Sequence, residues 1–321
     1  MRSLVAGVFV LVLAVPAAAS PVKRLGYCDF PVWSPNARQI AFRSTARANG
    51  EPEIWVMNAD GSHRHDLGQG NDSPTWSPDG KRVAFTAGVG IGTQTTVVVG
   101  RDGSGRHELP GYGEPDWSSL NEISYDGDDG VHAVRPDGTD DHLVAANGTD
   151  GRWSPNGRRL AFLLDGEIWR VNADGSGVKQ LTSVAPYDVI AFAWAPNGRA
   201  LALLVGVQPG PGGRHEPFEL RTIEANGGHA RVLARRRPPA GLRDLAWSPS
   251  SRLIAFVSLG RRSDIFEISS RGGAARRVTH TKGTEVEPDW GKSGRIAFSN
   301  GTNIYTIAAN GRDLRVLTRR K

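Results

Sequence analysis

The sequence predicts an all-β protein, a β-propeller of four-stranded blades, because one phrase is repeated seven times around a tryptophan. Glycine (40) and proline (20) together make up about a fifth of the 321 residues, which favours a turn-rich chain. Beyond the first twenty residues, no stretch keeps a helical period. Seven blades are predicted, with six as the alternative. The repeats are centred on Trp33, Trp76, Trp117, Trp153, Trp194, Trp247 and Trp290.

Each repeat contains four short apolar runs, which are the predicted strands. The fourth copy, Arg152–Thr182, has one run at its Trp, one at Ala-Phe, one at Ile-Trp-Arg-Val and one at Leu-Thr. Pro-Asn-Gly between the first two runs supplies the fixed φ of proline and the positive φ of glycine that a tight turn requires. Ala-Asp-Gly-Ser between the last two runs supplies a second turn. Each copy is therefore expected to fold as a four-stranded meander.

Radial stacking explains how such small sheets become stable. A four-stranded sheet of this size cannot bury both of its faces alone, whereas several sheets around an axis cover one another and leave few edges exposed. The recurring Trp and Ala-Phe pair are the expected packing units between neighbouring blades. The last copy already has its own fourth run, Leu314–Thr318. We therefore expect no strand to be exchanged between the termini.

Charge and cysteine content exclude several classes of protein. Residues 1–150 carry 12 basic and 19 acidic residues, a net charge of −7, and residues 151–321 carry 27 and 14, a net charge of +13. The polar average composition argues against a membrane protein with several spans. Cys28 is the only cysteine, which excludes an intrachain disulfide and a cysteine-clustered metal site.

The first twenty residues have the order of a secretory signal peptide. Arg2 precedes the apolar run Leu4–Val15, and the small residues Ala17–Ala19 form the expected cleavage region. The predicted organisation is a leader over residues 1–20 and a single propeller domain over residues 21–321. The mature chain is expected to be exported to the periplasm, the cell envelope or the outside of the cell.

The repeated phrase W-S-P-[DN]-G-[KR]-x-[ILV]-A-F, followed by I-[WY]-x-[VI]-x-A-[DN]-G and a closing L-T, resembles the TolB-like propeller family, whose units are called WD40-like or PD40 repeats. The resemblance covers nearly the whole mature chain and implies the propeller fold. TolB itself has an α/β domain before a six-bladed propeller. This chain is expected to consist of the propeller alone, so no role in the Tol–Pal system is carried over.

An acidic residue shortly before each Trp is the main candidate for a binding site. These acids lie three to six residues ahead of the Trp, where the innermost strand would begin, and seven carboxylates around a funnel would attract a cation or a basic peptide. Alternatively, each carboxylate accepts backbone N–H groups or pairs with an arginine of a neighbouring blade. The predicted funnel acids are Asp29, Asp72, Glu114, Asp150, Asp188, Asp244 and Glu287.

Loop lengths and a basic run suggest where partners would bind. The irregular loops Ala87–Thr95 and Val207–Pro217 fall on one predicted face, which favours that face for recognition. A patch of basic residues could bind an anionic surface. Nucleic acid is not an expected partner for an exported protein. Alternatively, these arginines simply lie in solvent-exposed turns and bind nothing. The acidic residues could bind calcium, but the sequence contains no complete set of metal ligands, so no metal site is predicted. The patch consists of Arg235, Arg236, Arg237, Arg261 and Arg262.

These patterns favour a non-enzymatic scaffold, a monomer that binds a protein or peptide partner at the cell envelope through its long-loop face. No GxSxG elbow, phosphate loop or metal-ligand cluster is present, and no catalytic residue is assigned. The alternative is a propeller enzyme, a hydrolase or lyase that uses carboxylates in the central funnel.

Overall fold

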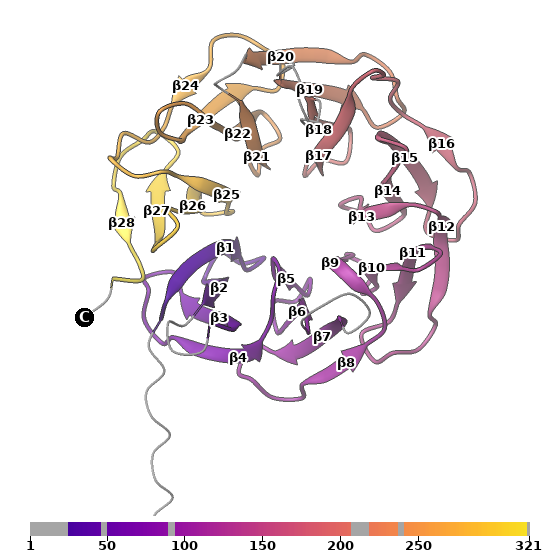
Figure 1. Ribbon diagram of the computed structural model, residues 1–321, viewed down its shortest axis with the longest axis horizontal. Helices are drawn as coiled ribbons and strands as arrows, with labels where there is room; N and C mark the ends of the chain where they lie inside the picture. Colours follow the sequence, from indigo (N-terminus) through magenta and orange to yellow (C-terminus); the bar gives the residue numbers. More distant parts are fainter. Residues whose placement is uncertain (1–24, 46–49, 89–93, 207–217, 237–240, 320–321) are drawn as a thin grey trace, which may run out of the picture.

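Seven four-stranded sheets surround a central axis in the computed structural model, as Figure 1 shows. The structure describes residues 25–45, 50–88, 94–206, 218–236 and 241–319. Within these ranges every regular element is a strand, and each sheet is an antiparallel meander in chain order. The seven-bladed prediction is confirmed and the six-bladed alternative is wrong. The predicted leader lies outside the described residues.

The blades share one layout from the axis outward. The innermost strands all end at the repeat tryptophan and are β1 (Tyr27–Trp33), β5 (Thr75–Trp76), β9 (Tyr112–Trp117), β13 (Thr149–Trp153), β17 (Asp188–Trp194), β21 (Leu242–Trp247) and β25 (Val286–Trp290). The second strands are β2 (Gln39–Thr45), β6 (Arg82–Ala87), β10 (Ile123–Gly127), β14 (Arg159–Leu164), β18 (Ala200–Gly206), β22 (Leu253–Ser258) and β26 (Arg295–Ser299).

The third strands are largely buried, whereas several outermost strands are mostly exposed. The third strands are β3 (Pro52–Asn58), β7 (Thr95–Gly100), β11 (Gly130–Val134), β15 (Glu167–Asn172), β19 (Phe218–Glu224), β23 (Asp264–Ser269) and β27 (Ile304–Ala308). The outermost strands are β4 (His65–Gln69), β8 (His107–Leu109), β12 (His142–Ala146), β16 (Lys179–Gln180), β20 (Arg231–Arg236), β24 (Arg276–Arg277) and β28 (Arg315–Val316). No helix in the described residues is long and apolar enough to cross a membrane.

The repeated W-S-P-x-G phrase closes the turn between the first two strands of a blade. In the fourth blade the Ser154 hydroxyl accepts a hydrogen bond from the backbone N–H of Arg159 at 3.0 Å. Gly157 has a φ of +68° there, which the turn requires and which glycine adopts without a steric penalty. The second blade repeats the bond between Ser77 and Arg82 at 2.9 Å. The serine and glycine of the phrase therefore define the turn rather than a site.

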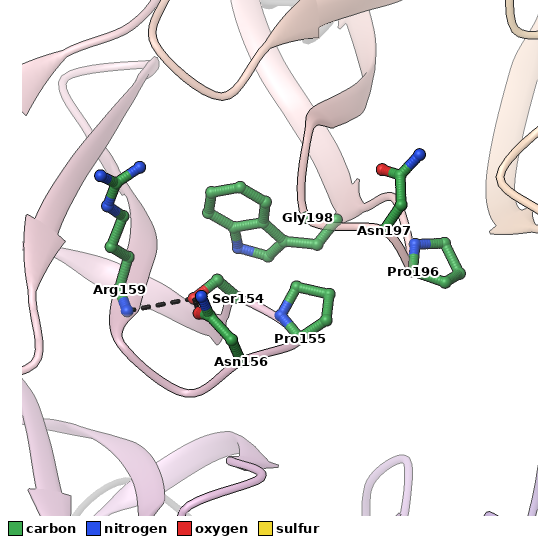
Figure 2. A pocket seen from close by; sticks show the side chains of 8 residues that line it. Ser154, Pro155, Asn156, Arg159, Pro196, Asn197 and Gly198 are labelled. Carbon is green, nitrogen blue, oxygen red and sulfur yellow. Dashed lines mark hydrogen bonds between the residues drawn. The ribbon is translucent and has the colours of Figure 1, made fainter.

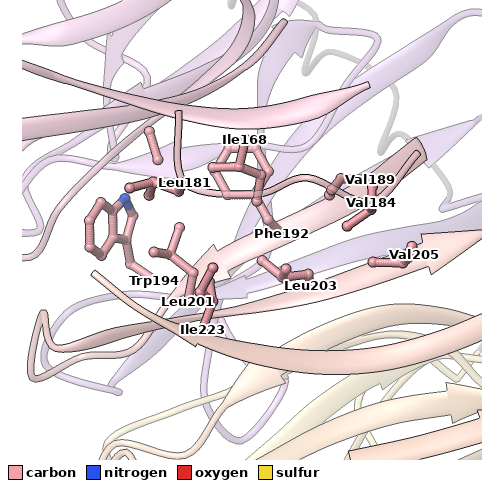
Figure 3. Packing of buried hydrophobic residues seen from close by; sticks show 11 residues of the cluster. Ile168, Leu181, Val184, Val189, Phe192, Trp194, Leu201, Leu203, Val205 and Ile223 are labelled. Carbon is pink, nitrogen blue, oxygen red and sulfur yellow. The ribbon is translucent and has the colours of Figure 1, made fainter. Parts of the chain in front are cut away.

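The predicted packing units lie in the core between blades. All seven repeat tryptophans are buried, and the phenylalanines of the Ala-Phe pairs, such as Phe162, are almost fully buried. Between the fourth and fifth blades, Ile168 and Leu181 pack against Trp194 and Leu201 of the next blade (Figure 3). Each interface buries apolar surface from both blades, which is the main stabilising contribution to the ring.

Basic side chains at the outer rim connect consecutive blades. The first residue of six outermost strands contacts a carbonyl oxygen in the next blade's outer turn through a side-chain nitrogen. Lys179 Nζ, for example, donates to the Asn226 carbonyl at 2.7 Å. The six residues are His65, His107, His142, Lys179, Arg231 and Arg276.

The ring closes without strand exchange among the described residues. The last sheet is formed by β25 to β28 and the first by β1 to β4, so each terminal blade uses only its own strands. Side-chain bonds join the two blades: the Ser299 hydroxyl donates to the Cys28 carbonyl at 2.6 Å, and the Asp289 carboxylate accepts the Trp33 N–H at 2.7 Å. The sequence prediction about closure is confirmed.

Candidate functional site

A β-bulge near the start of the inner strand is the feature that shapes the site. The register with the second strand shifts in β1, β9, β13, β17, β21 and β25. Phe30, Asp150, Asp244 and Glu287 occupy the same place, three residues before their tryptophan, and all have φ between 46° and 55°. A non-glycine residue in this conformation is strained by about 1 kcal/mol or more, and such strain clusters at functional sites.

The structure places one predicted acid near the start of each inner strand. Six of them lie within these strands, and Asp72 lies a few residues before β5. Asp188 is exposed, and the other six are partly buried. Because the inner strands surround the axis (Figure 1), their starts lie around one end of it, and we call this region the funnel site. That the ring binds a ligand stays a prediction.

Glu287 has the most perturbed environment of the seven acids. Its Oε2 accepts the Phe30 N–H of the first blade at 2.7 Å, and Asp244 of the sixth blade accepts the Glu287 N–H at 2.9 Å. Burial raises the pKa of Glu287 to about 7, and the charges of Asp29 and Asp244 add to the rise. Glu287 therefore holds a proton at a pH where an ordinary glutamate has lost it.

Arg43 of β2 neutralises Asp29 beside this acid. The guanidinium donates to both carboxylate oxygens of Asp29 at 2.8 and 2.7 Å and to the Asn71 carbonyl at 2.5 Å. It also lies 4.5 Å from the centre of the Phe30 ring. Asp29 chiefly raises the pKa of Arg43, and Glu287 and Asp72 contribute. Arg43 is thus a fixed positive charge among acids from the first, second and seventh blades.

A second arginine neutralises Glu114. Arg152, the residue before Trp153 in β13, pairs with the Glu114 carboxylate of the preceding blade and donates to the Glu114 carbonyl at 3.3 Å. Together with Asp29, Asp244 and Glu287, Glu114 fits the alternative in which the acids satisfy backbone N–H groups or arginines. That alternative therefore describes four of the seven acids.

The remaining three carboxylates accept no hydrogen bond from a described residue. Burial raises the pKa of Asp72, and Glu114 raises it further, while Arg43 opposes the rise. Asp150 is partly buried at its bulge. The Asp188 carboxylate lies close to the backbone of Gly166: a Cβ atom built on Gly166 would be only 2.2 Å from the Asp188 Oδ1. These three groups are available to a ligand or to water.

Sequence reasoning missed a second set of carboxylates, which are partly buried. Asp116 and Asp289 directly precede their tryptophans and accept the Trp153 N–H at 2.6 Å and the Trp33 N–H at 2.7 Å, in each case in the next blade. Asp126 of β10 accepts the Asp150 N–H at 3.1 Å. The Asp-Trp pair in two repeats was a visible signal for the first two. Burial raises the pKa of Asp289 and of Asp126 to about 6.

These raised pKa values predict how stability changes with pH. Between about pH 4 and pH 6 the folded chain keeps protons that the unfolded chain has lost, so its stability falls as the pH rises through that window. We expect Asp289→Asn to reduce the difference in unfolding free energy between pH 5 and pH 7.5, because asparagine still accepts the Trp33 N–H but carries no charge. One pKa unit corresponds to about 1.4 kcal/mol. Urea unfolding at both pH values measures the effect, and an unchanged difference would contradict it.

The predicted basic patch is only partly described. Arg235 pairs with Glu219 at 2.7 Å, and the Arg236 Nε lies 3.4 Å from the Ser258 hydroxyl. Arg261 and Arg262 are exposed, and Arg237 lies outside the described residues. The Val207–Pro217 loop and residues 89–93 of the Ala87–Thr95 loop also lie outside them.

Metal binding has little support in this geometry. Among the described residues, no group of three or more His, Cys, Asp or Glu side chains is placed to hold a metal ion. Calcium binding by the funnel acids therefore stays a prediction without a described ligand set.

Comparison with solved structures agrees with the fold. An oligogalacturonate lyase in complex with manganese superposes with a TM-score of 0.65 at 13% identity over 91% of this chain and 89% of that one. A puromycin hydrolase gives 0.69 at 16% identity over 95% of this chain and 56% of that one. TolB from Acinetobacter baumannii gives 0.54 at 19% identity over 83% and 57%. No protein-family model matches the chain.

The resemblance to TolB-like propellers is confirmed for the fold, but the preference for a non-enzymatic scaffold has to be corrected. It rested on the absence of catalytic motifs. The lyase and the hydrolase share this architecture over more than nine-tenths of the chain. The same fold therefore occurs in enzymes as well as in TolB. The manganese of the lyase is not carried over, because the described residues offer no matching group of ligands.

Proposed function

We propose that this protein is an exported propeller enzyme, a hydrolase that works by acid–base catalysis at the funnel site. The observation that carries the proposal is Glu287, a carboxyl group whose pKa is raised to about 7 on a strained bulge. A catalytic acid works best when its pKa lies near the working pH. Export rests on the predicted leader alone.

Two carboxyl groups in different environments take the roles of general acid and general base. Glu287 is the proton donor to the leaving oxygen, and Asp72, which has no described hydrogen-bond partner, accepts the proton of the attacking water. Water thus bonds to the electrophilic carbon while the bond from that carbon to the leaving group breaks. Both acids influence Arg43, which supports their placement around one guanidinium. Arg43 and Asp29 form a neutral pair that fixes the local charge.

The charges of the site indicate an uncharged or cationic substrate. Each of the three funnel arginines, Arg43, Arg152 and Arg243, is paired with a funnel acid. Among the described residues, no arginine pairs with the carboxylates of Asp72, Asp150 and Asp188, so the site stays negative and would repel a polyuronate. Elimination from uronates, the activity named for the lyase, is therefore the less favoured reaction.

Exposed apolar side chains near the starts of the inner strands favour a sugar. Tyr27 is 49% exposed, Tyr112 38% and Ile190 37%. Exposed aromatic rings suit the apolar face of a pyranose, and carboxylates suit its hydroxyl groups. An uncharged glycoside is thus the substrate class that we propose.

Turnover assays on the mature chain test this proposal. We expect hydrolysis of at least one uncharged aryl glycoside or oligosaccharide and none of polyuronates. An unsaturated product from a uronate polymer would instead establish a lyase, and the absence of turnover across neutral, cationic and acidic glycosides would overturn the proposal.

A further inference from the structure

A slot between the fourth and fifth blades lies at the opposite end of the inner strands from the funnel acids. The Trp194 indole at the end of β17 lies beside the fourth blade, where its N–H donates to the Arg152 carbonyl at 3.0 Å. Here the turns of the two blades leave a cavity of about 280 Å³. Figure 2 shows Arg159 and Asn197 on opposite sides of it in that view. We call this the indole slot, lined chiefly by Pro155, Asn156, Arg159, Trp194, Pro196 and Asn197.

Arg159 has a counterpart that fills the equivalent place between the second and third blades. Arg82, like Arg159, lies six residues after its own tryptophan, and its guanidinium stacks 5.0 Å from the centre of the Trp117 ring. The Asn121 carboxamide holds it there, accepting from Arg82 at 3.3 Å and from the Trp117 indole at 3.1 Å.

One residue explains why the slot is open. Asn121 lies four residues after Trp117 with φ +67°, and the equivalent residue after Trp194 is Gly198 with φ +68°. Glycine provides no carboxamide to anchor Arg159. In the part of the chain that the structure describes, the Arg159 guanidinium makes no ion pair or hydrogen bond, so its donors are free to meet a ligand.

Three side chains around the slot, Asn156, Arg159 and Asn197, present hydrogen-bond donors. The Asn156 Oδ1 already accepts from the Ser154 hydroxyl at 2.9 Å, and the Asn197 Oδ1 accepts from the Arg199 N–H at 3.0 Å. The NH₂ groups of both carboxamides therefore remain as donors beside the Arg159 guanidinium. No carboxylate of a described residue lines the slot. Such a donor set is complementary to an anion.

Unbalanced positive charge around the slot supports the same conclusion. The turns carry asparagine at 156 and 197, where the second blade has Asp79 before Lys81. Burial lowers the pKa of the nearby Arg170, and the charge of Arg159 lowers it further. An anion bound at Arg159 would relieve this repulsion.

We propose that the indole slot binds a uronic acid unit of an acidic polysaccharide. The carboxylate meets the Arg159 guanidinium, the two carboxamides donate to ring oxygens or hydroxyls, and the pyranose contacts Trp194 and the two prolines. The cavity lies near the lower end of the volumes of ligand pockets, about 300 Å³, which suits a single sugar ring. A peptide fits less well, because its backbone needs acceptors as well as donors.

A matched pair of asparagine variants tests the site. Gly198→Asn supplies the missing carboxamide at a φ that asparagine tolerates, and its Cβ would meet only Pro155 Cδ at 3.7 Å. It should draw Arg159 over Trp194 and fill the slot. Gly80→Asn is the control, with φ +67° and Pro35 Cδ at 3.6 Å, and leaves the slot unchanged.

Calorimetric titration would compare a β-1,4-linked glucuronate tetramer with cellotetraose, which differs from it only at C6. We expect the wild type and Gly80→Asn to bind the glucuronate and not cellotetraose, and both Gly198→Asn and Arg159→Gln to bind at least about tenfold more weakly. Glu287→Gln should bind normally, which separates this site from the proposed funnel chemistry. Unchanged binding in folded Gly198→Asn, equal binding of cellotetraose, or preference for an acidic peptide would overturn the proposal.

Discussion

Replacing Glu287 by glutamine should lower kcat of the funnel reaction by about 10²- to 10⁴-fold and leave KM nearly unchanged. Glutamine keeps the shape of the side chain and an oxygen for the Phe30 N–H, but it has no proton to transfer to a leaving group. Steady-state kinetics on the proposed class of uncharged glycosides measures this loss.

The pH profile gives a second readout of the same residue. Wild-type activity requires protonated Glu287 and should therefore fall as the pH rises through about 7, the pKa that burial gives this group. Asp72 must be ionised for activity, so it sets the fall of activity at low pH. In Asp72→Asn, the residual activity should show a shifted acidic limb of the pH profile. Glu108→Gln, on an exposed carboxylate of β8, is the control and should leave both limbs in place. A folded Glu287→Gln variant with wild-type kcat would rule out this residue as the acid.

The repeat made the fold and the position of the acids predictable. Each tryptophan occupies the same place in its blade, so residues a few positions ahead of it had to lie near the start of an inner strand. The turn glycines and the buried Ala-Phe pairs followed from the same alignment. Fixed offsets from a recurring buried residue therefore give reliable placement.

Contacts that depend on the register between paired strands could not be predicted from the repeat alignment. Arg43 lies fourteen residues after Asp29, and only the pairing of Asp29 with Arg43 across β1 and β2 brings their side chains together. The bulge that raises φ at Glu287 is a property of two paired strands, and the sequence carries no separate mark of it. The sequence thus indicated which acids lie near the starts of the inner strands, while their charge states required the backbone geometry.

The interface between the seventh and first blades, which closes the ring, contributes to the stability of the fold. Phe42 is fully buried in the cluster that joins these blades, where it packs with Ala297, Ile304 and Leu317 of the last blade. Because no strand is exchanged there within the described residues, side-chain packing and a few hydrogen bonds join the two terminal blades.

We expect Phe42→Ala to reduce the free energy of unfolding by about 3–5 kcal/mol, as measured by urea denaturation. Phe162→Ala, between the third and fourth blades, is the matched substitution and should have a similar global effect. Hydrogen exchange should distinguish the two variants, because loss of packing at the closing interface releases both terminal blades. Strands β1 and β27 should lose protection selectively in Phe42→Ala. Equal protection of these strands in both variants would mean that closure does not depend on this packing.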